Sequence, residues 1–272
     1  MAKREVPLNT EKCVWDSMDD DLIRSISNFL PAIPLTPKGV LYLTLVDKRT
    51  RVALKEWVGQ FRTDVERATK FCEKIGMTHK DVNDAVTLSK QDKGLDDDDV
   101  WVLAFNAKKG ALGSLLNLNL DFNQISDAGL IALSDTISKG AMAKLTCLDI
   151  AFNKISDAGI IALAEALKSP MGGLGSLVRL WLQGNRIGDE GMKAIASAAD
   201  SGALPLLLSL ELRSNVIGDA GMVALANAIK PTPGNPTRAL PSLLILGVDD
   251  GPLGTEHPQL KAACEARGIG LS

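Results

Sequence analysis

The chain has 272 residues, of which 46% are hydrophobic and 23% are charged, a composition typical of a folded protein with one or two domains. It excludes a disordered chain, collagen and a disulfide-rich miniprotein, and the net charge of -3 argues against broad electrostatic binding to nucleic acid or an anionic membrane. Only 4% of the residues are aromatic and two are histidine, so we expect an aliphatic core, no cofactor and little catalytic or metal chemistry.

Residues 1–80 predict a helical N-terminal unit. A first helix is expected over residues 19–30, which open with three Asp residues and end at Pro31. After a proline-interrupted loop, a second stretch begins at Val40 and runs through the sequence DKRTRVALKEW. A third helix is expected from Thr63 to Ile75, and its buried stripe would comprise Val65, Ala68, Phe71 and Cys72.

Residues 81–272 contain an internal repeat. Four segments superpose without a gap: LLNLNLDFNQISDAGLIAL from Leu115, LTCLDIAFNKISDAGIIAL from Leu145, LVRLWLQGNRIGDEGMKAI from Leu177 and LLSLELRSNVIGDAGMVAL from Leu207. A fifth copy from Leu243 keeps the apolar positions but loses Asn and Asp, and a degenerate copy precedes Leu115. The sequence therefore predicts about six repeats, with atypical first and last copies that shield the ends of the array.

Each repeat predicts a short strand followed by a helix. The apolar residues of LxxLxL alternate with period two, which indicates a strand with one buried face. An Asn recurs after each strand (Asn123, Asn153, Asn185 and Asn215), and its amide could satisfy backbone groups where the chain leaves the sheet. An Asp follows it (Asp127, Asp157, Asp189 and Asp219), and we expect this Asp to be the N-cap of the helix.

The pattern LxxLxLxxNxI, followed by a helix rich in Ala and Leu, resembles the leucine-rich repeat family, and the 30-residue spacing resembles its ribonuclease-inhibitor-like subclass. The resemblance covers roughly residues 82–267. It implies an α/β solenoid, curved so that a parallel sheet lines the concave side and helices line the convex side, with the N-terminal helices as a cap.

The N-terminal unit also resembles an F-box, a segment of about 40 residues that docks on the Skp adaptor of cullin-based ubiquitin ligases. The residues that carry this resemblance begin at Met18 and end at Arg49, and those expected to contact the adaptor are Leu22, Ile26, Phe29, Leu30, Leu45 and Val46. Asp19 and Thr50 depart from the residues usual in the family, which are Pro and Trp. A plain helical cap over the first repeat is the alternative, and the two roles are compatible.

In a solenoid, variable strand positions that face outward from the sheet carry specificity. We expect a protein-binding surface on the concave face, made of Asn117, Asn119, Asp121, Asp149, Arg179, Trp181, Gln183, Glu211, Arg213 and Asp249. Trp181 stands out among them, because an aromatic side chain on the open side of a strand is not expected to pack in the core. Trp and Arg also dominate interface hot spots. The competing reading is that Trp181 merely lies across Asp149 and Glu211.

Other conspicuous residues have structural explanations. The run from Asp96 to Asp99 suits the solvated start of a helix, and four consecutive Asp residues do not have the alternating spacing of a calcium site. Phe122 and Phe152 should stack along the edge of the solenoid, and Cys147 should be an inert thiol.

The four cysteines, Cys13, Cys72, Cys147 and Cys264, contain no CxxC pair, and the chain has no apolar stretch near the ~20 residues that a membrane helix needs. We therefore expect a reduced, intracellular protein without a signal peptide, in the cytoplasm or alternatively the nucleus.

The sequence thus predicts a non-enzymatic scaffold that binds a protein partner, as a monomer or as a subunit of a larger assembly. A substrate receptor of a cullin-based ubiquitin ligase, with the Skp adaptor as partner, is the second hypothesis. Regulation of a small GTPase, known for some proteins with this kind of repeat, is the third.

Overall fold

The computed structural model describes residues 48–170, 173–231, 239–251 and 253–272. The chain divides into two compact units, Met1–Val65 and Glu66–Ser272. The residues that we expect to contact an adaptor, Leu22, Ile26, Phe29, Leu30, Leu45 and Val46, lie outside the described residues.

After two consecutive helices, the described elements alternate between strand and helix. The helices are α2 (Lys48–Ile75), α3 (His79–Asn83), α4 (Asp97–Lys108), α5 (Asp127–Ile137), α6 (Asp157–Leu167), α7 (Asp189–Asp200), α8 (Asp219–Ile229) and α9 (Pro258–Arg267). The strands are β1 (Thr87–Ser89), β2 (Asn117–Asn119), β3 (Cys147–Asp149), β4 (Arg179–Trp181), β5 (Ser209–Glu211), β6 (Ile245–Gly247) and β7 (Gly270–Leu271). None of the described helices combines the length and the apolar composition that crossing a bilayer requires.

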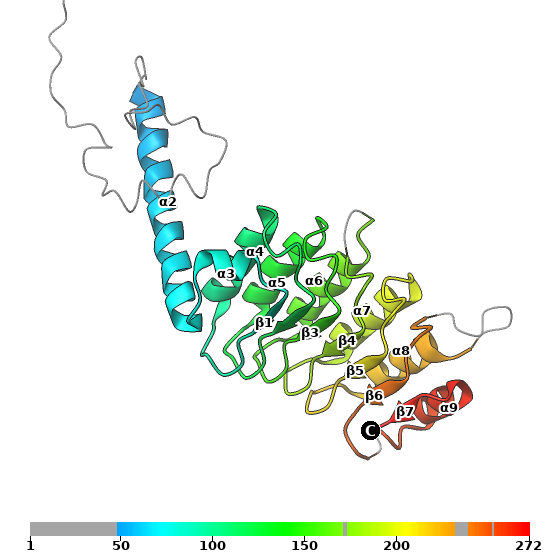
Figure 1. Cartoon of the computed structure of the whole chain (residues 1–272). Helices are drawn as coiled ribbons and strands as arrows, with labels where there is room; N and C mark the ends of the chain where they lie inside the picture. Colours follow the sequence, from blue (N-terminus) through cyan, green and yellow to red (C-terminus); the bar gives the residue numbers. More distant parts are fainter. Residues whose placement is uncertain (1–47, 171–172, 232–238, 252) are drawn as a thin grey trace, which may run out of the picture. The chain divides into compact units, whose positions relative to one another are not determined.

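The seven strands form one sheet in sequence order, and every neighbouring pair is parallel. The strands line the inner side of the arc of repeats and helices α4 to α9 line the outer side (Figure 1). We call the open side of the sheet the concave face. The repeats predict the first six strands, whereas β7, which pairs Leu271 with Leu246, was not expected.

The core is the thin layer between the sheet and the helices. One Leu at the centre of each repeat strand is almost completely buried, and these residues stand in register across the sheet: Leu88, Leu118, Leu148, Leu180, Leu210 and Leu246. The large side chains that fill this layer are mainly Leu and Ile, as the low aromatic content predicts.

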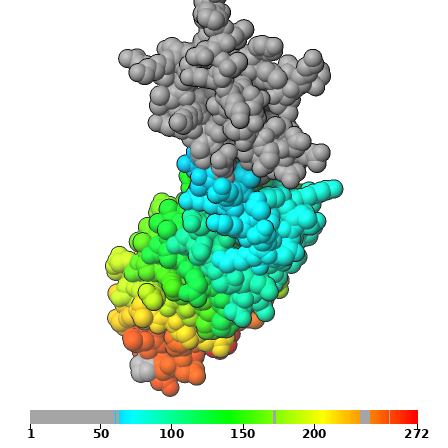
Figure 2. Space-filling view, turned by 90° about the vertical axis from the view of Figure 1, so that its left-hand side faces the viewer, coloured from blue at the N-terminus to red at the C-terminus, as the bar shows by residue number. Residues whose placement is uncertain are grey.

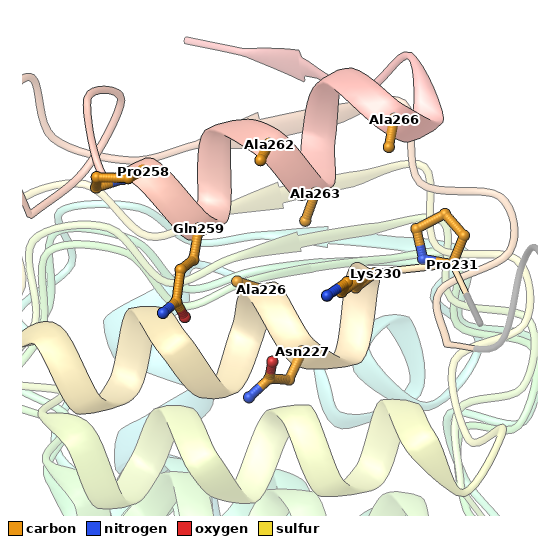
Figure 3. Close-up of a pocket in the computed structure, with 9 residues that line it drawn as sticks. All are labelled: Ala226, Asn227, Lys230, Pro231, Pro258, Gln259, Ala262, Ala263 and Ala266. Atoms are coloured by element: carbon orange, nitrogen blue, oxygen red, sulfur yellow. The ribbon is translucent and has the colours of Figure 1, made fainter.

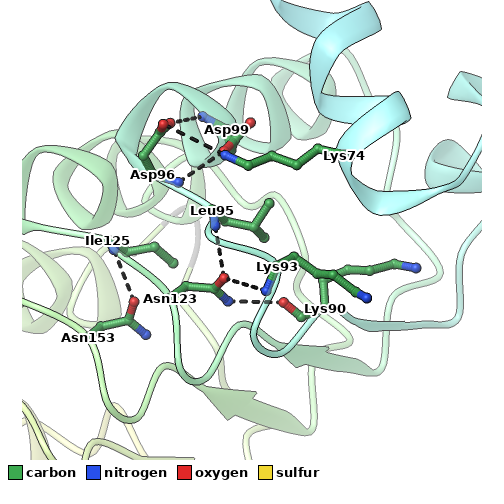
Figure 4. Close-up of polar contacts among 9 residues, drawn as sticks. All are labelled: Lys74, Lys90, Lys93, Leu95, Asp96, Asp99, Asn123, Ile125 and Asn153. Atoms are coloured by element: carbon green, nitrogen blue, oxygen red, sulfur yellow. Dashed lines mark hydrogen bonds and ion pairs between the residues drawn. The ribbon is translucent and has the colours of Figure 1, made fainter.

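The recurring Asn residues form the predicted ladder of hydrogen bonds between repeats. Asn153 accepts from the amide of Ile125 at 3.0 Å and donates to the carbonyl oxygens of Leu120 at 3.0 Å and Ile150 at 3.2 Å. Asn123 binds the turn of the preceding repeat in the same way, through the amide of Leu95 and the carbonyl of Lys90 (Figure 4). One side chain thus satisfies backbone groups in two successive turns.

The prediction that each recurring Asp caps its own helix is wrong. The N-caps of α5 and α6 are Ser126 and Ser156, and the Asp that follows is the first helical residue. Its carboxylate instead serves the next repeat: Asp127 Oδ1 accepts from the amide of Ser156 at 2.7 Å and from that of Gly159 at 3.0 Å. The Asp therefore satisfies orphan amides of the neighbouring helix, which spacing within one repeat could not reveal.

The glycine after each Asp is required by the same contact. A Cβ added to Gly159 would lie 2.7 Å from Asp127 Oδ1, and one added to Gly191 would lie 2.6 Å from Asp157 Oδ1. Because the carboxylate must reach the amide of this residue, there is no room for a side chain. The motif Asp-x-Gly thus links two repeats: the Asp of one repeat accepts a hydrogen bond from the amide of the Gly in the next.

Within the described residues, the N-terminal helices differ from the prediction in one respect. Residues 48–75, which the prediction divides between a second and a third helix, form one continuous helix, α2, because a single Gly at position 59 weakens a helix by only about 1 kcal/mol and no Pro interrupts it. Ala68, Phe71 and Cys72 are buried, as expected for the third helix; Val65 is half-buried, and Ile75, which was not in the predicted stripe, is buried as well. Figure 2 looks onto this end of the repeat unit, where blue-to-cyan residues form the surface.

The four consecutive Asp residues at the start of α4 have separate roles. Asp96 and Asp99 form a reciprocal capping box, and Lys74 of α2 pairs with both carboxylates (Figure 4). Asp97 accepts from the amides of the second repeat, and Asp98 lies 3.7 Å from an Arg67 nitrogen. The helix start is therefore joined to its neighbours, whereas the sequence predicted a solvated end.

The last helix is anchored by a histidine in the place of the usual Ser or Gly. His257 is the N-cap of α9; its Nδ1 accepts from the amide of Leu260 at 3.3 Å, and its Nε2 lies 3.0 Å from Asp219 Oδ1. Since Nδ1 is an acceptor, Nε2 carries the proton and donates to Asp219. Asp219, like the other recurring Asp residues, therefore accepts a hydrogen bond from the next repeat, but the donor is the imidazole of His257 instead of backbone amides.

Candidate functional site

The outward side chains of the concave face form three rows across the strands. The first row contains Thr87, Asn117, Cys147, Arg179, Ser209 and Ile245. The middle row contains Ser89, Asn119, Asp149, Trp181, Glu211 and Gly247. The third row follows the strands and contains Gln91, Asp121, Ala151, Gln183, Arg213 and Asp249. All ten residues predicted to bind a partner belong to these rows.

Trp181 lies at the centre of the middle row, on β4. Its neighbours in register are Asp149 on β3 and Glu211 on β5. The Trp181 side chain is half-buried, whereas Arg179, two residues earlier on the same strand, is exposed. A half-exposed indole flanked by polar groups offers both apolar area and an N–H donor to a partner.

Two carboxylates beside this centre are held in an unfavourable environment. Asp149 is only 3% exposed; its Oδ1 accepts from the amide of Ala151 at 3.1 Å, and among the described residues it has no cationic partner. Burial raises the pKa of Asp149 to about 6, and the charge of Asp121 adds to the shift. Burial also raises the pKa of Asp121, against the hydrogen bonds that Asn119 and the backbone give it.

Two oxygen atoms of the third row are buried without a hydrogen-bond partner in the described structure. They are Oδ1 of Asp121 and Oε1 of Gln183, which lie on either side of Ala151. Buried polar atoms normally find a partner, so each exception needs an explanation. The concave face therefore has a concentration of unsatisfied acceptors between β2 and β4.

Glu211 and Arg213 form a closed pair on the other side of Trp181. The Arg213 Nε and Nη2 atoms lie 3.1 Å and 2.9 Å from Glu211 Oε2. The carboxylate lies over Gly247, where an added Cβ would come within 1.9 Å of Oε2. Glu211 thus extends toward β6.

The remaining predicted residues have local contacts. Asn117 donates to Thr87 Oγ1 at 3.3 Å, and Asp249 Oδ1 accepts from the amide of Ser214 at 2.7 Å. Burial raises the pKa of the Cys147 thiol, and the neighbouring Arg179 only partly offsets this. A thiol with a raised pKa is a poor nucleophile, as expected for an inert cysteine.

An aromatic pair borders the third row. Phe122 and Phe152 are stacked as predicted, with ring centroids 4.3 Å apart and an interplanar angle of 12°. Both residues have a left-handed backbone, with φ of 54° and 49°, at a turn position that is Gly184 in the next repeat. A bulky residue in this conformation costs roughly 1–2 kcal/mol.

Despite this conformational cost, the two rings are not buried in the core. Phe122 is 53% exposed and Phe152 is 40% exposed. Gly184 leaves room for the Phe152 ring, since a Cβ there would lie 2.3 Å from Cδ1 of that ring. The pair forms an exposed apolar platform over three repeats. Asp92 and Ser214 have the same left-handed backbone at the equivalent positions, so this conformation belongs to the turn of the repeat.

Sequence reasoning missed a second apolar feature, which we call the entry row because it comes just before the strands. It comprises Val86, Leu116, Thr146, Val178, Leu208 and Leu244, and each member after Val86 donates its amide to the carbonyl of the one before at 2.8–2.9 Å. Four of them are exposed apolar residues: Val86, Leu116, Leu208 and Leu244. The sequence does carry a signal, because the second residue of nearly every repeat is apolar. This residue lies before the strand, outside the alternation of apolar and polar residues that we used to predict the strand.

A groove of about 590 Å³ lies between α8 and α9, on the helical side of the solenoid (Figure 3). Its walls are mostly small residues, among them Ala226, Ala263 and Ala266, and Lys230 is the one ionisable residue among those lining it. Among the described residues, no three His, Cys, Asp or Glu side chains are arranged to hold a metal ion.

A family model for the leucine-rich repeat matches four segments of the chain, residues 114–134, 141–164, 176–196 and 203–226. Each segment contains one strand and the beginning of the helix that follows it, from β2 with α5 to β5 with α8. No curated protein matches the chain. With the all-parallel sheet and its alternating helices, these matches define an α/β leucine-rich repeat solenoid, a class that generally mediates protein–protein interaction.

Proposed function

We propose that this protein is a non-enzymatic interaction module that binds a protein partner on the concave face of the solenoid, centred on Trp181. The observation that carries the proposal is the half-buried indole of Trp181 in the middle row, whose neighbours in register are the polar residues Asp149 and Glu211. Aromatic anchors with a polar rim are typical of interface centres. Six repeat strands span about 24 Å at ~4.8 Å each, enough for one interface of standard size.

The test is partner capture by the full-length protein from its native cell, followed by an affinity measurement with Trp181→Ala. We expect this variant to bind the captured partner more weakly by about 2 kcal/mol or more, with little change in melting temperature. Loss of the fold would instead show that Trp181 is structural. Unchanged affinity in a folded variant would overturn the proposal.

Trp101 on α4 provides a matched control. It is also a half-buried Trp, but it stacks on Phe105 at 5.2 Å and lies under the Arg67 guanidinium at 5.3 Å, on the helical side of the solenoid. We expect Trp101→Ala to leave partner affinity unchanged within about twofold, since neutral positions shift binding by a few tenths of a kcal/mol.

The F-box resemblance of residues 18–49 supports a second function, a substrate receptor of a cullin-based ubiquitin ligase. In that role the N-terminal helices would bind the Skp adaptor while the repeats hold the substrate. Co-purification of the adaptor with the full-length protein, and its loss in Leu45→Asp, is the expected result. No binding to the adaptor at micromolar concentration would remove this function and leave the first proposal intact.

Three further features belong to the proposal. The repeat length favours the ribonuclease-inhibitor-like subclass. A reducing compartment, the cytoplasm or the nucleus, suits the free and buried thiols of Cys72, Cys147 and Cys264. The protein would act as a monomer or as one subunit of a larger assembly.

A further inference from the structure

The concave face between β2 and β4 contains acceptor atoms that the donors of the described structure leave unsatisfied. Asp121 Oδ1 and Gln183 Oε1 are buried and have no hydrogen-bond partner among the described residues. Asp149 lies between them in the fold, on β3; it is 97% buried, and only its Oδ1 accepts a hydrogen bond, from the amide of Ala151. A group that completes this site must supply several N–H donors.

The same group must be a cation. Asp121 and Asp149 bring two carboxylates to the site, and neither has an ion-pair partner in the described structure. Of the nearest cations of the concave face, Arg213 pairs with Glu211, and Arg179 is exposed on the first row beside Cys147 and forms no ion pair with either carboxylate in the described structure. Two carboxylates that remain unpaired on a largely desolvated surface favour a positively charged group from outside.

The third requirement is an apolar contact. Phe122 follows Asp121 and Phe152 follows Ala151 in the chain, and their exposed, stacked rings lie at the turns that come directly after the third row. Aromatic rings attract a planar guanidinium and pack against the methylene groups that carry it. Water or a small inorganic cation would satisfy the carboxylates but would gain nothing from the rings.

We propose that this part of the concave face is a receptor for an arginine side chain of the protein partner, with Asp121, Asp149 and Gln183 accepting from the guanidinium and Phe122 and Phe152 contacting its stem. The five-donor fork of arginine matches a set of several acceptors, whereas a lysine ammonium is a compact point charge. The inference rests on the proposed function and specifies the chemistry of the partner.

The experiment titrates the full-length protein with the peptide Gly-Gly-Arg-Gly-Gly while the amide signals of Ala151 and Phe152 are followed by NMR. A single side chain should bind with a dissociation constant on the order of 1 mM. The same peptide with citrulline, which keeps the shape but has no charge, should bind at least ~10-fold more weakly. Equal binding of the citrulline peptide, or of a lysine peptide, would overturn the proposal.

Substitutions locate the binding site. Asp121→Asn preserves the shape and one acceptor oxygen but removes the charge, and we expect it to weaken the arginine peptide by ~10-fold or more. Asp135→Asn, on the exposed face of α5, is the control and should leave the affinity unchanged. If Asp121→Asn binds the peptide as the unaltered protein does, the proposal fails.

This test is separable from that of the proposed function. If Trp181→Ala keeps full affinity for the captured partner while the arginine peptide still binds at Ala151, the proposed interface fails and the arginine receptor stands. If the partner is lost but the peptide never bound, the interface stands and the arginine receptor fails.

Discussion

At the scale of single residues, position in the repeat array decides what a side chain does. Asn153 and Asp127 are both polar residues in recurring motifs, and both bind backbone groups of a neighbouring repeat. Asp149 is also polar but faces the concave side, where it meets one amide and no cation among the described residues. The first two stabilise the fold, whereas the third is held at a cost that a partner could remove.

The charge of Asp149 should make the protein less stable at neutral pH. A folded-state pKa of about 6, above the ordinary carboxyl pKa of 3.8, means that the native state binds the proton more tightly than the unfolded state. This group therefore lowers stability as the pH rises through 6. We expect Asp149→Asn to raise the free energy of unfolding by up to ~3 kcal/mol at pH 7 and by only ~1 kcal/mol near pH 4.5.

Urea unfolding at the two pH values measures this difference. Asp135→Asn is the matched control, because Asp135 is an exposed carboxylate paired with Lys139 on α5, and its replacement should change stability by less than ~0.5 kcal/mol. Destabilisation by Asp149→Asn at pH 7 would contradict a raised pKa for Asp149 in the folded state.

At the scale of elements, each helix depends on the repeat before it. The N-terminus of α7 has Gly188 as its N-cap, which has no side chain to accept a hydrogen bond. Asp157, from the start of α6, supplies the missing acceptor to the amides of Gly188 at 2.6 Å and Gly191 at 3.0 Å. The repeats are thus coupled through their helix ends as well as through the sheet and the Asn ladder.

Asp157→Ala should destabilise the protein by about 1–3 kcal/mol, because it leaves two amides of α7 without a partner. Glu190→Ala, at the second residue of α7, removes a carboxylate that pairs only with exposed Lys193, so a change below ~0.5 kcal/mol is expected. Thermal and urea unfolding of both variants provide the comparison, and equal effects would refute the inter-repeat role of the Asp.

At the scale of the repeat unit, the two ends of the solenoid are closed by different means. The first repeat is covered by the last turns of α2 and by α3, with Phe71 and Val82 fully buried, and Lys74 joins α2 to the start of α4. The last repeat is closed by α9 and β7, with His257 as the contact to α8. Without such caps the apolar layer between sheet and helices would be open to water.

Phe71→Ala tests the N-terminal cap. Its side chain is 0% exposed, so we expect a loss of about 3–5 kcal/mol in stability. In a solenoid each repeat is stabilised mainly by contacts with its neighbours. Hydrogen exchange should therefore accelerate most in β1 and α4, next to the cap, and least in β6 and α9. Glu73→Ala, an exposed position on the same helix, is the control, and uniform acceleration along the repeats would argue against a local cap.

The sequence by itself determined the repeat, the parallel sheet, the Asn ladder and the aliphatic core, because each follows from a pattern within some 30 residues. Only the tertiary structure decided that Asp127 serves the next helix, that Glu211 leans over Gly247 and that Asp149 is buried. These facts depend on which residues lie beside one another in adjacent repeats. The strain at Phe122 and Phe152 and the exposed entry row were likewise visible only in the fold, because backbone conformation and exposure at one position are set by its neighbours in space.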